Sequence, residues 1–287
     1  MNIGVDIGGT NIRAGVEKEG VITQQNHLLL QQKDNLDATL SQLTGLLRPL
    51  IHQEVRGIGI GVPSVVDTSA GVVYNVMNIP SWEEVALRDI LQDEFHIPVA
   101  INNDVNCFTL GEHRYGQMQP FQSIIGLSIG TGIGSGIITN NQLYVGHNCG
   151  AGEIGMLPYR DSILEDYASN RFFERELGMD AFLTHNLALN GEQRAIEAWR
   201  DFGLHLAAAI KTLLYTYDPE AIVIGGSLAK ASDFFRPAMM EAMQDFAYPQ
   251  TIKRLHIQMS QNENIALLGA VALLDDLPKI SVADHIV

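Results

Sequence analysis

Three glycine-rich turns follow apolar segments of the chain, and a carboxylate stands just ahead of the first. The turns are DIGGTN at 6–11, IGTGIGSG at 129–136 and GGS at 225–227. Glycine allows backbone N–H groups to come close to an anion, so such turns can bind phosphate. Asp6 alternates with apolar residues of a strand, where a carboxylate is costly unless it is paired, hydrogen-bonded or near a metal. The first turn is therefore either a phosphate-binding turn with a carboxylate near Mg²⁺ or a plain glycine hairpin.

A second polar cluster, NNDVN at 102–106, follows the apolar segment VAI. Asp104 in this position can accept a proton from a substrate hydroxyl as the hydroxyl attacks, and so act as a general base. Its neighbour Asn103 offers both a donor and an acceptor, which suits a hydroxyl. The same residues can also form an Asx cap that begins the next helix, and capping does not exclude catalysis.

The length and composition favour a two-lobed protein with small-molecule partners. A chain of 287 residues exceeds most single-core domains, and 46% hydrophobic residues give it ample core material. The formal net charge of −15 argues against nucleic acid and anionic membranes as partners, but not against a small anion in a prepared site. Cys107 and Cys149 are too few for a disulfide framework, so reduced thiols and a cytoplasmic location are expected.

Apolar periodicity predicts alternating strands and helices along the chain. In the first half we expect antiparallel strands at 3–16 and 21–31, a helix at 35–54, a strand that ends at Pro63, a helix at 81–96 with Ser81 as N-cap, and a strand and helix around 102–106. In the second half we expect strands on both sides of the turn at 129–136, a long helical region that includes 195–217, a strand from 221, and helices at 237–246 and 266–276.

The second half repeats the first in outline, because each begins with a strand, a glycine turn and a strand. This repeat predicts two related α/β lobes, one formed by 1–115 with the C-terminal helix at about 270–287, the other by 116–269. We expect a ligand cleft between them. The apolar stripe of the helix at 195–217 is expected to be core rather than interface. No signal peptide is expected, and no apolar run reaches the roughly 18 residues of a membrane span.

The complete set of motifs resembles the ROK family of bacterial sugar kinases, within the sugar kinase/actin/Hsp70 superfamily. The motifs occur in the family's order and are DIGGTN (6–11), GVPSVVD (61–67), NNDVN (102–106), IGTGIGSGI (129–137), GAGEIG (150–155), LEDYAS (164–169) and DPEAIVIGGSLA (218–229). They cover nearly the whole chain. The resemblance implies an α/β fold of the two-lobed actin-like ATPase (ribonuclease H-like) type, with a duplicated mixed sheet flanked by helices.

The resemblance also implies a role for each matching residue. Two turns would bind the phosphates of ATP: Gly8, Gly9, Thr10 and Asn11 form the first, and Gly130, Thr131, Gly132 and Gly134 the second. Asp6 would lie near Mg²⁺, through water, and the adenosine would contact Gly225, Gly226 and Ser227. The sugar would contact Asn103, Asp104, Glu153 and Glu165, with Asp104 as the catalytic base. Glu153 could equally be an exposed turn carboxylate, and Glu165 an acid at a helix N-terminus.

The sequence departs from the family's pattern where many members bind a structural zinc ion. Those members carry GEIGH followed by a CxCGxxGCxE segment, whereas this chain has GEIGMLPYRDSILEDYAS. Met156 stands in place of the histidine, and His147 has no cysteine partners, so we expect no zinc site. The lost histidine would alter the pocket near the anomeric carbon of the sugar. Ser64 in GVPSVVD, where the family usually has glycine, is a milder departure.

The resemblance implies an ATP-dependent kinase for the 6-hydroxyl of a hexose, with glucose as the preferred substrate. The alternatives are a kinase for a β-glucoside, fructose, allose or N-acetylmannosamine, and a non-catalytic sugar-sensing protein. ROK repressors carry an N-terminal helix-turn-helix, whereas this sequence begins its phosphate strand at residue 3, so a repressor is disfavoured. Family members are often dimers, so a homodimer is expected.

Overall fold

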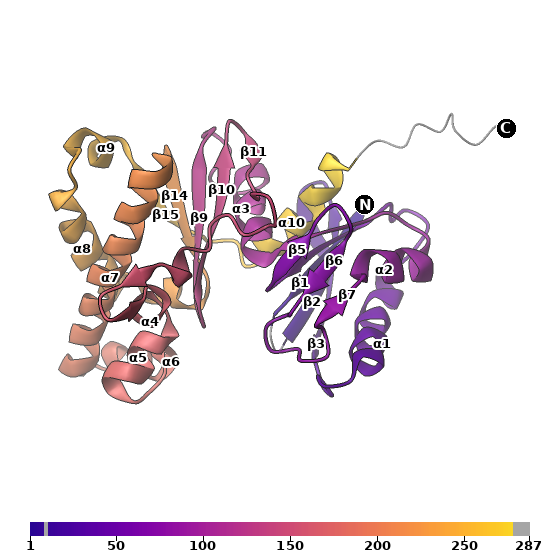
Figure 1. The fold of residues 1–287 in the computed structure, drawn as a ribbon, viewed down its shortest axis with the longest axis horizontal. Helices are drawn as coiled ribbons and strands as arrows, with labels where there is room; N and C mark the ends of the chain where they lie inside the picture. The colour runs from indigo at the N-terminus through magenta and orange to yellow at the C-terminus, as the bar shows by residue number, and fades with distance from the viewer. Residues whose placement is uncertain (9–10, 278–287) are drawn as a thin grey trace. The chain divides into compact units, whose positions relative to one another are not determined.

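The computed structural model describes residues 1–8 and 11–277 of the chain, which form two compact units (Figure 1). Gly9, Thr10 and residues 278–287 lie outside the described residues. Unit 1 comprises Met1–Cys107 and the segment from Ala266 onward, and unit 2 comprises Phe108–Ile265. The boundaries between the two units therefore fall after Cys107 and after Ile265. The sequence predicts them after residue 115 and near residue 270.

Unit 1 is built on a five-stranded mixed sheet in the order β3-β2-β1-β4-β8. Its strands are β1 (Asn2–Ile7), β2 (Asn11–Lys18), β3 (Val21–Leu29), β4 (Ile58–Val62) and β8 (Val99–Asn103). β1 is antiparallel to β2 and parallel to β4, which is parallel to β8. The unit also contains α1 (Leu36–Leu47), η1 (Arg48–Leu50), α2 (Leu87–Phe95) and a small sheet of β5 (Val65–Asp67), β6 (Val72–Tyr74) and β7 (Glu84–Val85).

Unit 2 contains a second five-stranded sheet with the same plan. Its order is β11-β10-β9-β14-β15, and its strands are β9 (Ile124–Ile129), β10 (Ile133–Thr139), β11 (Gln142–Leu143), β14 (Ala221–Gly225) and β15 (His256–Met259). β9 is antiparallel to β10 and parallel to β14, which is parallel to β15, as in the first sheet. The α/β class and the duplicated mixed sheet predicted from the sequence are confirmed.

Unit 2 also contains helices, short 3₁₀ turns and one further pair of strands. The helices are α3 (Asp104–Arg114, whose first residues belong to unit 1), α4 (Glu165–Ala168), α5 (Asn170–Leu177), α6 (Ala181–Leu189), α7 (Gln193–Tyr217), α8 (Ser232–Ala242) and α9 (Pro249–Arg254). Short 3₁₀ turns lie at η2 (Ile154–Met156), η3 (Ser227–Ala231) and η4 (Met243–Asp245), and β12 (Pro158–Tyr159) pairs with β13 (Ser162–Ile163).

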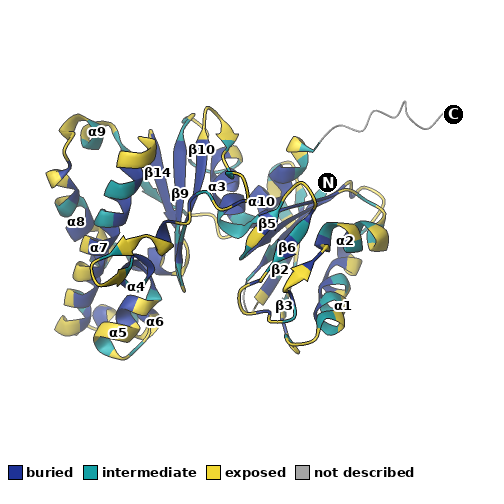
Figure 2. Cartoon of the chain, in the orientation of Figure 1, coloured by how far each residue is buried: buried dark blue, intermediate teal, exposed yellow. Residues whose placement is uncertain are grey.

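The long helix α7 supplies much of the core of unit 2. Trp199, Phe202, Leu206 and Ile210 are almost fully buried in one cluster with the apolar residues of β9 and β14. Figure 2 shows the buried residues along these strands and on α7. The prediction that this helical stripe is core is confirmed.

The C-terminal helix α10 (Ile265–Ala272), followed by η5 (Leu273–Asp276), lies directly on the sheet of unit 1. Glycine makes this close approach possible. A Cβ atom at Gly4 of β1 would lie 2.0 Å from the Leu267 carbonyl oxygen, and one at Gly59 of β4 would lie 1.7 Å from the Ala270 carbonyl oxygen. These distances leave no space for a side chain, so both glycines are required for α10 to cover this sheet.

The helix predicted at 81–96 is wrong in its first part. α2 begins only at Leu87, and Ser81 lies in a turn ahead of β7 instead of capping a helix. The adjacent Trp82 is fully buried, and its indole N–H donates to the Thr39 hydroxyl of α1 at 2.7 Å. Burial of this large side chain decides the local structure here, against the capping pattern.

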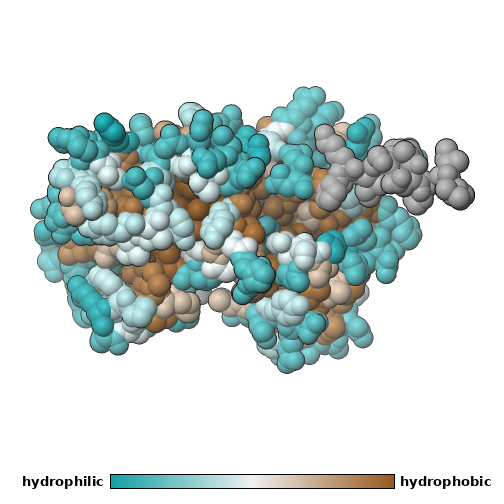
Figure 3. Space-filling view, turned by 45° about the horizontal axis from the view of Figure 1, so that its top comes forward, coloured by the Kyte–Doolittle hydropathy of each residue, from teal (hydrophilic) through white to brown (hydrophobic). Residues whose placement is uncertain are grey.

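No helix in the described part of the chain is both long and apolar enough to cross a membrane. In the face that Figure 3 shows, hydrophilic residues are spread over the surfaces of both units. This distribution agrees with a formal net charge of −15 carried by a chain whose apolar side chains lie largely inside.

Candidate active site

The predicted site residues of unit 1 gather at one edge of its sheet. β1, β4 and β8 are parallel, and their register places Asp6, Gly61 and Asn102 side by side on the three strands. Ligands of open α/β sheets bind beyond the carboxyl ends of the strands, which is where these residues lie. Asn103 and Asp104 follow directly at the end of β8.

The first glycine turn joins β1 to β2. The Gly8 N–H donates to the Asn11 carbonyl at 2.8 Å and closes the turn, while the predicted phosphate ligands Gly9 and Thr10 lie outside the described residues. Asp6 pairs with Arg13, which stands opposite it on β2 and approaches its Oδ2 atom to 2.7 Å. The other oxygen, Oδ1, accepts no hydrogen bond from any described residue, so it remains accessible to a hydrated cation.

Asp104 is the first residue of α3, and its neighbour Asn103 caps that helix. The Asn103 Oδ1 atom accepts the N–H groups of Val105 at 2.9 Å and Asn106 at 3.2 Å, which confirms the capping alternative. The Asn103 Nδ2 atom donates to the Ser64 carbonyl at 3.4 Å. These bonds fix the start of α3 and hold the half-buried Asp104 carboxylate at the sheet edge.

Close packing of α3 on β4 supports this placement. A Cβ atom at Gly61 would lie 3.2 Å from Cys107 Sγ and 3.3 Å from the Asp104 Cα atom. Contacts this tight leave little room for a side chain at Gly61. The Asp104 backbone is therefore positioned by two independent elements, the cap of α3 and its contact with β4.

The second glycine turn joins β9 to β10 in unit 2. The Gly130 N–H donates to the Gly132 carbonyl at 2.9 Å, and Thr131 at the tip is exposed. No described residue accepts a hydrogen bond from the N–H groups of Thr131 or Gly132. Unpaired N–H groups on an exposed glycine turn are suitable donors to an anion. Gly134, the fourth predicted turn residue, lies in β10 opposite Ser128.

Glu165, at the start of α4, contacts the second glycine turn. Its Oε2 atom accepts the Ile133 N–H at 3.2 Å, and its Oε1 atom pairs with the Arg171 guanidinium at 3.0 Å. The side chain is only 8% exposed, and each carboxylate oxygen has a protein partner. A Cβ atom at Gly132 would lie 2.4 Å from Oε2, which explains why glycine is needed at this position.

Glu153 lies on the loop that precedes η2, and its residue surface is exposed. Desolvation by the surrounding groups raises the pKa of Glu153 above its usual range, and the negative charge of Glu165 raises it further. The loop is fixed to β10, because the Ser135 N–H and hydroxyl both donate to the Gly152 carbonyl, at 3.1 and 2.8 Å. The effect of the Glu165 charge shows that Glu153 lies near Glu165.

The third glycine turn lies beside the second, at the end of β14. Gly226 has φ of 89°, and a Cβ atom there would lie 2.2 Å from the Ile129 carbonyl oxygen, so only glycine fits. A Cβ atom at Gly130 would lie 3.3 Å from the Ser227 hydroxyl oxygen. Gly225 packs against the ring of Phe108, to which a Cβ atom would come within 2.5 Å.

Two basic residues of these sites were missed in the sequence analysis. Arg13 and Arg171 are the ion-pair partners of Asp6 and Glu165. The signal for Arg13 was present, because a hairpin centred on residues 9 and 10 places positions 6 and 13 opposite each other. Arg171 lies six positions after Glu165 across the break between α4 and α5, and no periodic pattern relates such a pair.

Within residues 1–8 and 11–277, no group of three or more His, Cys, Asp and Glu side chains is arranged to hold a metal ion. Met156, which stands where the family's zinc members have histidine, is 54% exposed beside the Glu153 loop. The absence of zinc stays a prediction, and so does the assignment of Asp6 to hydrated Mg²⁺.

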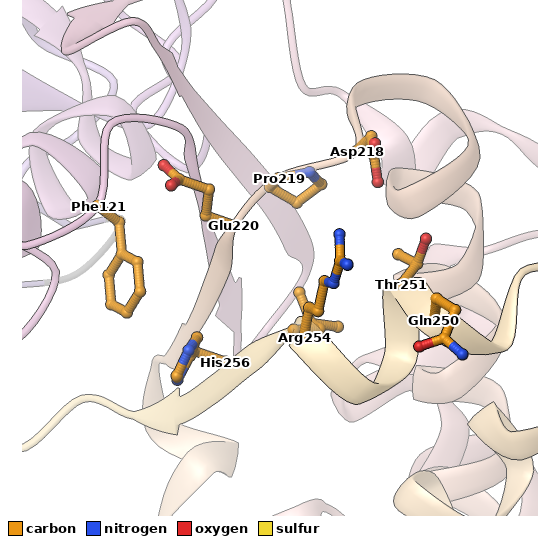
Figure 4. A pocket seen from close by; sticks show the side chains of 9 residues that line it. Phe121, Asp218, Pro219, Glu220, Gln250, Thr251, Arg254 and His256 are labelled. Carbon is orange, nitrogen blue, oxygen red and sulfur yellow. The ribbon is translucent and has the colours of Figure 1, made fainter.

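A separate cavity of about 380 Å³ lies at the opposite edge of the sheet of unit 2 (Figure 4). Its walls include Phe121, Glu220 and His256, which precede or begin β9, β14 and β15, whereas the glycine turns lie where β9 and β14 end. The Glu220 carboxylate already accepts the N–H groups of Gln122 and Ser123, at 2.7 and 2.9 Å. This cavity is therefore distinct from the candidate active site.

Comparison with known proteins identifies the relatives of this chain. The family model described as "ROK family" matches residues 2–276. A glucokinase of Streptomyces coelicolor is 30% identical over 271 residues, covering 81% of this chain and 84% of that protein. A xylose repressor of Bacillus subtilis is 25% identical over 305 residues, covering 96% of this chain and 77% of the repressor.

Solved structures show the same fold. A ROK family glucokinase from Streptomyces griseus, determined in complex with glucose and AMPPNP, superimposes with a TM-score of 0.81 at 24% identity and covers 95% of this chain and 98% of that one. The relatives therefore include both glucokinases and a xylose repressor.

Proposed function

Because the chain belongs to the ROK family, we propose that it is an ATP-dependent sugar kinase that phosphorylates the 6-hydroxyl of a hexose. Glucose is the preferred substrate, in keeping with the glucokinase relatives. Asp104 is the proposed general base, and ATP with Mg²⁺ is the proposed phosphoryl donor.

The observation that carries this proposal is the placement of Asp104. Its carboxylate stands at the carboxyl edge of the sheet of unit 1, at the start of a helix fixed by Asn103 and by the contact with Gly61. A base held in this way accepts the hydroxyl proton as the oxygen attacks phosphorus, and it orients the hydroxyl beforehand. A protein that only senses sugars needs hydroxyl contacts but no such base.

The glycine turns fit the phosphates of a nucleotide. The N–H groups of Thr131 and Gly132 have no acceptor among the described residues, and Gly226 allows a close backbone approach beside them. Fixed N–H donors stabilise the charge on the phosphoryl oxygens during transfer. Asp6 would hold Mg²⁺ through water, and the metal, when bound, shields the negative charge of the phosphates.

Sugar contacts are proposed for Asn103, Asp104, Glu153 and Glu165. The Glu153 carboxylate can accept a hydrogen bond from a sugar hydroxyl, and desolvation and then the charge of Glu165 raise the pKa of its carboxyl group. Met156 adds an exposed apolar side chain close to this loop, which suits a substituent on the anomeric oxygen. A β-glucoside is therefore the second candidate substrate, ahead of fructose, allose and N-acetylmannosamine.

The direct test is ADP release from Mg·ATP with a panel of free hexoses and β-glucosides, for the wild type and for Asp104→Asn. We expect turnover with glucose, and a loss of about two to four orders of magnitude in kcat for the variant, because the amide cannot accept the proton. Sugar binding, measured by calorimetry, should change much less than kcat. Asp89→Asn, at an exposed carboxylate on α2, serves as the matched control.

The outcomes separate the function classes. Unchanged turnover in Asp104→Asn would refute the assignment of the base. Binding of sugar with no ADP release from any substrate by the wild type would favour the non-catalytic sensor, to which the repressor relatives point.

A further inference from the structure

We propose that Tyr159 and His205 are positioning residues that anchor the hairpin β12–β13 to α7 and thereby hold Glu153 and Glu165 in place for the sugar. The inference deepens the proposed function and rests on it, because it takes both carboxylates as sugar contacts. The hairpin lies in the stretch where the sequence departs from the family's zinc pattern.

The two carboxylates stand on either side of the hairpin, at its base. Glu153 directly precedes η2, and Glu165 begins α4 after β13. The Leu164 N–H closes the base of the hairpin, because it donates to the Leu157 carbonyl at 2.9 Å. A Cβ atom at Gly155 would lie 3.4 Å from Glu165 Oε2, so the backbone that follows Glu153 runs beside the second carboxylate. A displaced hairpin would therefore displace the base on which both carboxylates stand.

Tyr159 of β12 reaches a buried partner on α7. Its hydroxyl oxygen lies 3.1 Å from the Nδ1 atom of His205, a residue that is 5% exposed. Burial, and then the charges of Arg160 and Arg175, lower the pKa of His205 to about 4, so the imidazole is neutral at pH 7. A neutral imidazole has one donor and one acceptor nitrogen, so either tautomer can form this bond with a hydroxyl. The bond ties the hairpin to the helix that supplies much of the core of unit 2.

Tyr167 of α4 completes an aromatic cluster around this bond. Its ring centroid lies 5.1 Å from that of Tyr159 and 5.0 Å from that of His205, both in edge-to-face geometry. The guanidinium carbon atoms of Arg175 and Arg160 lie 3.9 and 5.4 Å from the centroid of the Tyr167 ring. Edge-to-face rings attract one another, and cations over an aromatic face add to the attraction. The hairpin, α4, α5 and α7 therefore meet at one cluster.

Two side-chain hydrogen bonds join the hairpin directly to α4. The Tyr167 hydroxyl donates to the Asp161 carboxylate in the hairpin turn, and the Ser162 hydroxyl of β13 donates to the Asp166 carboxylate. The bond from Ser162 is the largest cause that lowers the pKa of Asp166. Because Asp166 directly follows Glu165, these bonds fix the first turn of α4 relative to the hairpin.

The test compares Tyr159→Phe, which removes only the hydroxyl, with Tyr159→Ala, which also removes the ring. Calorimetry measures the Kd for glucose without nucleotide, or for the best substrate of the sugar panel if that is another sugar. For Tyr159→Phe we expect the Kd to rise about 3- to 10-fold, because one hydrogen bond of the anchor is lost. For Tyr159→Ala we expect a rise of about 10- to 100-fold, because the carboxylates lose their placement.

The affinity for Mg·ADP, measured without sugar, should change less than the affinity for glucose. The second glycine turn is closed by its own bond from the Gly130 N–H to the Gly132 carbonyl, so it does not depend on the hairpin for its shape. Equal losses of glucose and Mg·ADP affinity would show general damage to unit 2 and would overturn the proposal.

Tyr217→Phe is the matched control. It makes the same chemical change at the end of α7, where the ring is 36% exposed and its hydroxyl has no hydrogen-bond partner among the described residues. Its glucose affinity should remain that of the wild type. Circular dichroism and thermal unfolding confirm that each variant is folded. A lower Tm for Tyr159→Phe and Tyr159→Ala with unchanged glucose affinity would show a merely structural role and would also overturn the proposal.

Sugar affinity without nucleotide separates this inference from the proposed reaction. If the wild type binds sugar but releases no ADP, the kinase function fails, whereas a weakened sugar affinity in Tyr159→Ala still supports the positioning role. If the wild type turns over and Tyr159→Ala binds sugar as tightly as the wild type does, the positioning role fails alone. A wild type that binds no sugar of the panel would overturn both.

Discussion

Three of the carboxylates that were predicted as site residues have different surroundings. Asp6 pairs with Arg13, and Glu165 pairs with Arg171, whereas Glu153 has no ion pair among the described residues. Glu153 also experiences the negative charge of Glu165. A guanidinium therefore lies beside the carboxylate at two positions, whereas desolvation and a neighbouring negative charge raise the pKa at the third.

Glu153→Gln should stabilise the ligand-free protein at neutral pH. Because folding raises the pKa of Glu153, its contribution to stability is fully present below the unfolded pKa and is lost as the pH rises through the folded pKa. Removing the charge should raise Tm at pH 7 by about 1–2 °C, and the gain should vanish in acid. Thermal unfolding of both proteins at pH 7 and pH 4 measures this. A lower Tm for the variant at pH 7 would show that the ionised form is stabilised instead.

At the scale of elements, glycines decide how closely helix α10 lies on its sheet. Gly59→Ala would place a Cβ atom 1.7 Å from the Ala270 carbonyl oxygen, so α10 would have to shift. We expect a loss of about 2–4 kcal/mol in the free energy of unfolding, measured by urea titration.

Gly45→Ala provides the control for the same chemical change. Gly45 lies exposed in α1, and its added Cβ would meet no atom within 4 Å. Because alanine is the better helix former, this variant should gain about 0.5–1 kcal/mol. A similar loss in both variants would mean that the close approach of α10 is not the cause.

Regular elements could be predicted from the sequence, whereas segments governed by distant contacts could not. The apolar periodicity of α7 and the alternation in β1 and β2 arise from burial on one side, which short-range patterns record. The start of α2 depends instead on Trp82, whose partner Thr39 lies 43 residues away. No local pattern records this contact, so a serine followed by two acids wrongly predicts a helix start.

The candidate site was predictable to the same extent. The glycine turns and Asn103 were found because their backbone requirements act within a few residues. The contacts of Glu165 could not be predicted, because they join α4 to the start of β10 and to α5. The LEDYAS motif indicates where Glu165 stands in the sequence but not which residues it contacts. Roles that depend on a tertiary partner need the structure.

Acid stability is a property of the whole molecule to which the buried His205 should contribute between neutral pH and pH 4. His205 on α7 is 5% exposed, and its Nδ1 atom lies 3.1 Å from the Tyr159 hydroxyl of β12. Burial, and then the charges of Arg160 and Arg175, lower the pKa of His205 from 6.5 to about 4. The imidazole is therefore neutral in the folded protein at pH 7.

The sign of the effect follows from proton binding. The unfolded chain takes up a proton at His205 near its ordinary pKa and the folded protein only near 4, so stability is present above the unfolded pKa and is lost as the pH falls to about 4. The shift from 6.5 to about 4 corresponds to roughly 3 kcal/mol. Urea unfolding at pH 7 and pH 4.5 should show a larger loss for the wild type than for His205→Gln. Equal losses in the two proteins would assign the acid sensitivity to other groups.

The placement of α10 has a consequence for synthesis. Unit 1 combines the first residues of the chain with a helix near its other end, because α10 packs on Gly4 and Gly59. A ribosome completes all five strands of that sheet long before it adds the helix, and meanwhile makes the whole of unit 2. One apolar face of the newly made sheet therefore stays uncovered until α10 is synthesised, and in that time it can bind chaperones or aggregate. Unit 2 is free to fold first.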